Sequence, residues 1–140
     1  MQDRQQERLA ELRRQVEAEK QDCDNLYPRD VAGPQRYSYR ARCLNEVETR
    51  LIRPLDPFPD LVDQRLAARK ALAAELDAGR LSEAQANARL AEKNAQIAAE
   101  ERRRTASTSA ISADATAALA QQRTALGTTC TNLDAAVSCF

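Results

Sequence analysis

The sequence contains no histidine and no tryptophan, and it has only three glycines in 140 residues. Without histidine, the commonest general base and metal ligand is missing. Three isolated glycines cannot build a phosphate-binding loop, and no run of about 18 apolar residues is present to cross a membrane. We therefore expect a protein that is not an enzyme, that uses no cofactor or metal and that has no transmembrane segment.

Large apolar residues are also scarce. Leu, Val, Ile and Phe together account for 25 residues, whereas alanine alone accounts for 27. Alanine has the highest helix propensity, but each alanine buries little apolar area. The composition predicts an all-α fold, a single helical unit over residues 1–140, in which long helices meet along thin apolar seams.

The charges cancel, with 21 basic and 21 acidic residues. The chain therefore has no global basic field to attract nucleic acid. Arginine supplies 18 of the 21 basic residues. A GC-rich genome explains this bias as readily as phosphate binding does, so the bias alone identifies no partner.

Residues 1–53 predict an N-terminal helical hairpin. Its first helix, about 2–26, carries a heptad seam with one charged exception: Leu9, Leu12, Val16, Glu19, Cys23 and Leu26. Two prolines and a glycine in residues 28–36 indicate a loop, and a second helix follows at about 37–52. Helices joined by a loop of this length should pack antiparallel.

Three closely spaced prolines in residues 54–60 predict a semi-rigid elbow. A central αα-hairpin over 61–105 follows, with helices at about 61–78 and 83–104. Asp60 is a suitable N-cap for the first of them. Gly79 can end that helix in the left-handed conformation, and Ser82 with Gln85 forms a capping box for the next.

Residues 110–140 predict a C-terminal helix, about 111–129, followed by a disulfide tail. Together these elements give an elongated bundle of two antiparallel hairpins, an elbow and a last helix. The apolar spacing of Leu119, Leu126, Cys130, Leu133 and Val137 continues to the end of the chain.

The four cysteines, Cys23, Cys43, Cys130 and Cys139, predict disulfides rather than a zinc site. Their separations of 20, 87 and 9 residues lack the closely spaced pairs of zinc sites. We favour Cys23–Cys43 with Cys130–Cys139, and the second pair requires that the last helix breaks near residues 131–132. Pairing Cys23 with Cys130 and Cys43 with Cys139 stays open.

Disulfides are typical of an oxidising compartment, so we expect a periplasmic or extracellular protein. No apolar segment follows Met1, and a secreted form of this sequence would therefore have lost its signal peptide.

Two groups of residues are candidates for partner contacts. Arg102, Arg103 and Arg104 end a helix, where they form either a solvated terminus or a contact with anionic lipid or nucleic acid. Tyr37, Tyr39 and Phe58 form the second group. Phe58 either packs on a helix face or stays exposed as an anchor for a partner.

These features favour a non-enzymatic structural or interaction protein of the bacterial cell envelope. It would act through helix-face contacts with a protein partner or with itself, because thin alanine-rich seams often complete their burial by association. The alternative is a small-ligand-binding helical module, with a cavity between the helix pairs at the Pro54–Pro59 elbow near the three aromatic residues.

Overall fold

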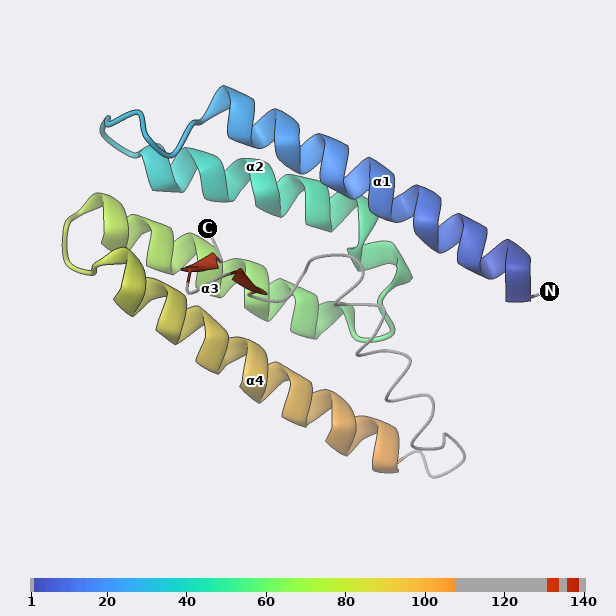
Figure 1. The fold of residues 1–140 in the computed structure, drawn as a ribbon. Helices are drawn as coiled ribbons and strands as arrows, with labels where there is room; N and C mark the ends of the chain where they lie inside the picture. Colours follow the sequence, from blue (N-terminus) through green and yellow to red (C-terminus); the bar gives the residue numbers. More distant parts are fainter. Residues whose placement is uncertain (1, 108–130, 134–135, 139–140) are drawn as a thin grey trace.

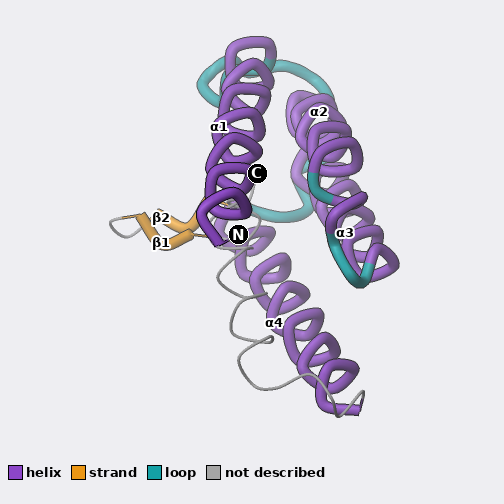
Figure 2. The backbone as a smooth tube through the Cα atoms, turned by 90° about the vertical axis from the view of Figure 1, so that its right-hand side faces the viewer, coloured by secondary structure: helices purple, strands orange, loops and turns teal. Residues whose placement is uncertain are grey.

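The computed structural model describes residues 2–107, 131–133 and 136–138, and the prediction of an all-α fold is confirmed over residues 2–107. Its four α-helices are α1 (Gln2–Leu26), α2 (Arg36–Leu51), α3 (Pro59–Asp77) and α4 (Glu83–Ser107). The helices pack in chain order, α1 on α2, α2 on α3 and α3 on α4 (Figure 1). Figure 2 shows the same order from the side, where the four helices form one curved layer.

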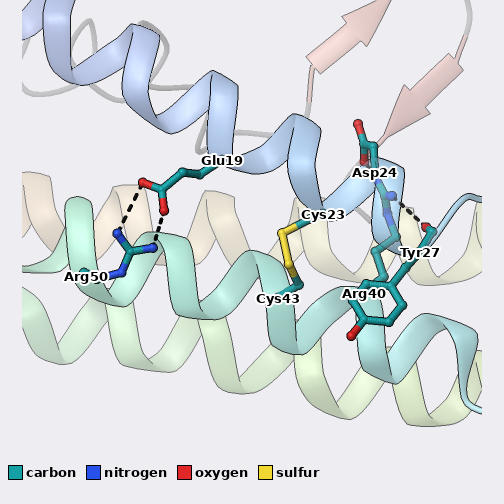
Figure 3. The surroundings of a disulfide bond; sticks show 7 residues. All are labelled: Glu19, Cys23, Asp24, Tyr27, Arg40, Cys43 and Arg50. Carbon is teal, nitrogen blue, oxygen red and sulfur yellow. Dashed lines mark hydrogen bonds and ion pairs between the residues drawn. A yellow bond between two sulfur atoms is a disulfide. The ribbon is translucent and has the colours of Figure 1, made fainter.

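The first apolar cluster lies between α1 and α2. Its buried members are Val16, Cys23, Leu44, Val47 and Ile52. The predicted disulfide Cys23–Cys43 is confirmed, with 5.8 Å between the two Cα atoms. Glu19, the charged exception in the seam, forms an ion pair between α1 and α2 with Arg50 (Figure 3). The α1 seam therefore joins α2 through apolar contacts, one covalent bond and one ion pair.

Leu26 departs from the predicted seam, because its side chain is 68% exposed. The contact between α1 and α2 at this level is polar. Asp24 forms an ion pair with the buried Arg40, whose guanidinium also donates a hydrogen bond to the Tyr27 carbonyl at 3.3 Å. The apolar seam consequently ends at Cys23, and the last turn of α1 leaves Leu26 in solvent.

The second apolar cluster lies between α3 and α4 and contains Leu76, Ala86 and Leu90. The turn between these helices has the predicted chemistry. Gly79 adopts a φ of +72°. The Ser82 N–H donates to the Gln85 side-chain carbonyl at 2.9 Å, and the Gln85 N–H donates to the Ser82 hydroxyl at 3.1 Å. Each residue therefore satisfies a backbone donor of the other at the start of α4.

The segment between α2 and α3 contains a short 3-10 helix, η1 (Arg53–Leu55). The third helix begins at Pro59, and Phe58 takes the N-cap position that we assigned to Asp60. Proline is well suited to the first helical position because its φ is already helical and it lacks an N–H. Asp60 lies in the first turn instead, where it pairs with Arg104 of α4.

The described part of the C-terminal region consists of two antiparallel strands, β1 (Thr131–Leu133) and β2 (Ala136–Ser138). Their register pairs Thr131 with Ser138, and β2 contacts α4. Leu133 and Val137 therefore lie in strands, although their spacing suggested a helix. The helix expected at 111–129 and the Cys130–Cys139 bond lie outside the described residues. The long-range alternative is wrong, because Cys23 and Cys43 are bonded to each other.

Candidate functional site

A buried carboxylate, that of Glu48, joins three helices. Its side chain is fully inaccessible to solvent. It contacts Lys20 of α1 at 3.1 Å, Arg65 of α3 at 2.7 Å and Arg69 of α3 at 3.1 Å. Asn45 accepts a further hydrogen bond from Arg69 at 3.0 Å and donates to the Leu66 carbonyl at 2.9 Å. The interface of α2 with α3 therefore has a polar centre, which we call the Glu48 network.

Two opposing effects set the pKa of Glu48. Burial raises the pKa of this carboxyl, but the positive charges of Arg69, Arg65 and Lys20 outweigh burial and hold it well below its ordinary value. Burial also lowers the pKa of Lys20, and the charge of Glu48 opposes that change. The ion pairs of Glu48 with Lys20, Arg65 and Arg69 therefore hold α1, α2 and α3 together through one buried carboxylate.

A second carboxylate, Asp77 at the end of α3, caps α2 from a distance of about 40 residues in the chain. It accepts hydrogen bonds from the backbone N–H groups of Tyr37 and Ser38, each at 2.9 Å. The Tyr37 hydroxyl donates to Glu83 of α4. Burial and this hydrogen bond raise the pKa of Tyr37. Tyr37 is therefore fixed where α2, α3 and α4 meet.

The three aromatic candidates are not brought together. Tyr37 contacts Asp77 at the end of α3, whereas Phe58 precedes the start of the same helix. The two residues therefore lie at opposite ends of a 19-residue helix, about 28 Å long at 1.5 Å per residue. A single cavity lined by Tyr37, Tyr39 and Phe58 is excluded by this separation.

Exposed apolar side chains gather where α1 and α2 are joined. We call this group the tip cluster; its exposed fractions are Leu26 68%, Val31 57%, Tyr39 41% and Tyr27 36%. The rings of Tyr27 and Tyr39 stack with centroids 6.0 Å apart. The guanidinium of Arg42 lies 5.8 Å from the Tyr39 ring. Tyr39 is thus part of an exposed surface that also contains Val31 and Leu26, although the heptad spacing placed Leu26 in the buried seam.

Several contacts among the end of α1, the following loop and the start of α2 hold the backbone next to the tip cluster. Tyr27 follows Cys23 by one helical turn, and beside the Cys23–Cys43 bond Arg40 contacts both Asp24 and the Tyr27 carbonyl (Figure 3). Arg36 extends this support, because its guanidinium donates to the Arg29 carbonyl at 3.0 Å. Exposed side chains held in one arrangement lose little further entropy when a partner binds.

A groove of about 260 Å³ lies between α3 and α4, beside the elbow. Its lining side chains are Leu61, Gln64, Lys93, Gln96, Ile97, Glu100 and Arg104. Leu61 and Ile97 are nearly inaccessible to solvent, at 2% and 6% exposure, and supply its apolar wall. Sequence reasoning missed Lys93 and Gln96, although Lys93 is three residues before Gln96 and four before Ile97, spacings that place these residues on neighbouring positions of one face of α4.

The arginine triplet at the end of α4 is largely engaged within the protein. Arg104 donates to both Asp60 oxygens at 2.9 and 2.8 Å, and its guanidinium lies 5.4 Å from the Phe58 ring. Arg103 and Arg104 both bind Glu100, and these hydrogen bonds lower the pKa of the Glu100 carboxyl to about 2. Arg102 is exposed. Arg104 therefore clamps α4 to the start of α3 through Asp60 and Phe58, whereas Arg103 pairs within α4.

Among the described residues, no cluster of three or more cysteine or carboxylate side chains could hold a metal ion. In the same part of the chain, no helix combines the length and the apolarity that a bilayer span requires. No protein-family model, no curated protein and no solved structure matched this sequence.

Proposed function

We propose that this protein is a non-enzymatic interaction protein of the bacterial cell envelope and that it binds a protein partner through the tip cluster. The observation that carries the proposal is the exposure of Leu26, Tyr27, Val31 and Tyr39 on one end of an otherwise polar helical hairpin. Exposed apolar groups that gather in one place commonly mark interaction sites.

The composition of this end supports a protein as the occupant. Tyrosine and arginine are enriched in the residues that contribute most to binding at protein interfaces. Residues 24–42 contain four arginines and two aspartates, a net charge of plus two in a chain whose total charge is zero. We therefore propose a partner whose contact surface is apolar with an acidic rim.

The envelope location rests on the Cys23–Cys43 bond, since disulfides persist in oxidising compartments. The finer arrangement expected from the sequence is part of the proposal: two antiparallel hairpins, joined by a Pro-rich elbow in an elongated bundle, would present the tip cluster at one end.

Site-specific crosslinking in the native host tests this proposal. A photoreactive amino acid would replace Val31, and in a matched control it would replace Leu55, because both side chains are 57% exposed. We expect one defined adduct from position 31, which disappears when Tyr39→Asp is added, and no such adduct from position 55. The same adducts from both positions, or an adduct that tolerates Tyr39→Asp, would show that the tip cluster is not the interaction site. An adduct that contains only a second copy of this chain would show that the tip cluster mediates self-association and does not bind a different protein.

The alternative function, a small-ligand-binding module, has one specific observation in its favour. The groove between α3 and α4 lies beside the elbow and combines an apolar wall with polar side chains. Such a combination is common in ligand sites, although this groove is smaller than most of them.

A further inference from the structure

Some charged side chains that line the groove form ion pairs with residues of opposite charge, and one does not. Glu100 accepts hydrogen bonds from Arg103 and Arg104, and Arg104 binds both oxygens of Asp60. Lys93 lines the same groove and is half-buried, yet it makes no ion pair with any described residue. These five charged groups sum to plus one, and the excess charge is that of the Lys93 ammonium.

We propose that the groove binds a small anionic amphiphile, whose acidic head contacts Lys93 and whose apolar part packs on Leu61 and Ile97. This inference deepens the alternative function and does not depend on the tip cluster. The amides of Gln64 and Gln96 also line the groove and make no hydrogen bond with described residues, so they are available to a ligand.

The size of the groove limits the ligand. Its volume of about 260 Å³ equals that of about nine water molecules at roughly 30 Å³ each. A linear carboxylate of eight carbons has a similar number of heavy atoms, so octanoate is a suitable probe. A cationic head would meet Lys93 and Arg104, whereas Glu100 is already bound by two arginines.

The floor of the groove gives the apolar part of the ligand a fixed surface. Leu61 is in the first turn of α3, next to the Asp60–Arg104 clamp, and Ile97 is one heptad after Leu90 in the α3–α4 core. Both side chains are almost fully buried, at 2% and 6% exposure, so each presents only a small edge to the groove. A chain laid along them would lose water contact without any repacking of the helices.

Titration of the oxidised full-length protein with octanoate, followed by amide chemical shifts in NMR spectra, tests the inference. We expect saturable shifts at the amides of residues 61–64 and 93–100, and about tenfold weaker binding in Lys93→Gln, because a hydrogen bond to a charged group is lost. Lys70→Gln is the matched control. It removes the same charge from an exposed position of α3 that does not line the groove, and it should leave the affinity unchanged.

Octanol and octyltrimethylammonium complete the test. Octanol should bind more weakly than octanoate and should be insensitive to Lys93→Gln, and the cation should not bind. Octanoate binding that is unchanged in Lys93→Gln would overturn the anionic assignment while leaving a neutral ligand site. Absence of groove shifts with all three probes would overturn the inference and the alternative function together. Neither result bears on crosslinking at the tip cluster.

Discussion

Replacement of Glu48 by glutamine should destabilise the fold strongly. The substitution preserves the size of the side chain but removes the carboxylate that Lys20, Arg65 and Arg69 contact in the interior. Removal of one partner from a buried ion pair typically costs about 3–5 kcal/mol, because the remaining charge stays buried without compensation. The glutamine carbonyl still accepts one hydrogen bond, so we expect a loss of about 3 kcal/mol.

Urea denaturation followed by far-ultraviolet circular dichroism measures this loss. A change of about 3 kcal/mol corresponds to a decrease in melting temperature of roughly 10–15 °C for a chain of this size. Glu46→Gln is the matched control, since Glu46 is an exposed residue of the same helix. Its effect should stay within about 0.5 kcal/mol. A loss below about 1 kcal/mol in Glu48→Gln would refute the idea that this network holds three helices together.

The pH dependence of stability provides an independent test of the Glu48 network. The folded pKa of Glu48 lies below its ordinary value of 4.5, because the three cations outweigh the effect of burial. A carboxyl with a lowered pKa contributes its full stabilisation above its ordinary pKa and loses it as the pH falls toward the folded pKa. The difference in unfolding free energy between the wild type and Glu48→Gln should therefore be constant from pH 7 to about 5 and shrink below pH 4.5. A difference that is unchanged between pH 7 and 3 would show that Glu48 carries no lowered pKa.

A double-mutant cycle with Arg69→Met isolates the pair energy. If Glu48 and Arg69 interact as their two hydrogen bonds indicate, the double variant should be at least about 1 kcal/mol more stable than the sum of the single losses suggests. Additive losses would mean that the two residues stabilise the fold separately.

Three further substitutions test the local structure by urea denaturation. Cys23→Ala with Cys43→Ala should cost about 3 kcal/mol, because the bond closes a loop of roughly 20 residues, and reduction of the wild type should have a similar effect; an unchanged midpoint would contradict the stabilising role of the bond. Ser82→Ala removes the side-chain acceptor at the start of α4 and should cost about 1 kcal/mol, and a neutral result would mean that this cap is dispensable. Gly79→Ala should cost about 1 kcal/mol because its φ of +72° strains any residue with a Cβ atom, whereas Gly33→Ala, also in open space but without a positive φ, should be neutral; equal effects at both positions would refute the conformational argument.

The sequence alone predicted the features that depend on near neighbours in the chain. The 3–4 spacing of apolar residues predicted α1, and the residue pattern around Gly79 predicted the α3–α4 turn. The facing positions of Cys23 and Cys43 followed from two helices and one loop length, and their bond is confirmed. These features could be predicted because helix periodicity, capping and proline effects act over only a few residues.

Tertiary structure decided the placement of the charges. Glu48 continues the buried stripe of α2 four residues after Leu44, and Arg65 and Arg69 interrupt the stripe of α3. That periodicity was visible in the sequence, but charged residues on helices are usually solvated, and only the approach of α2 to α3 buries these three as a compensated set. The same holds for the tip cluster, which forms where the end of α1 and the start of α2 lie side by side, and for Lys93, which became a candidate only when α3 and α4 formed a groove around it. Each depends on residues far apart in the chain, and only the packing of the helices brings them together.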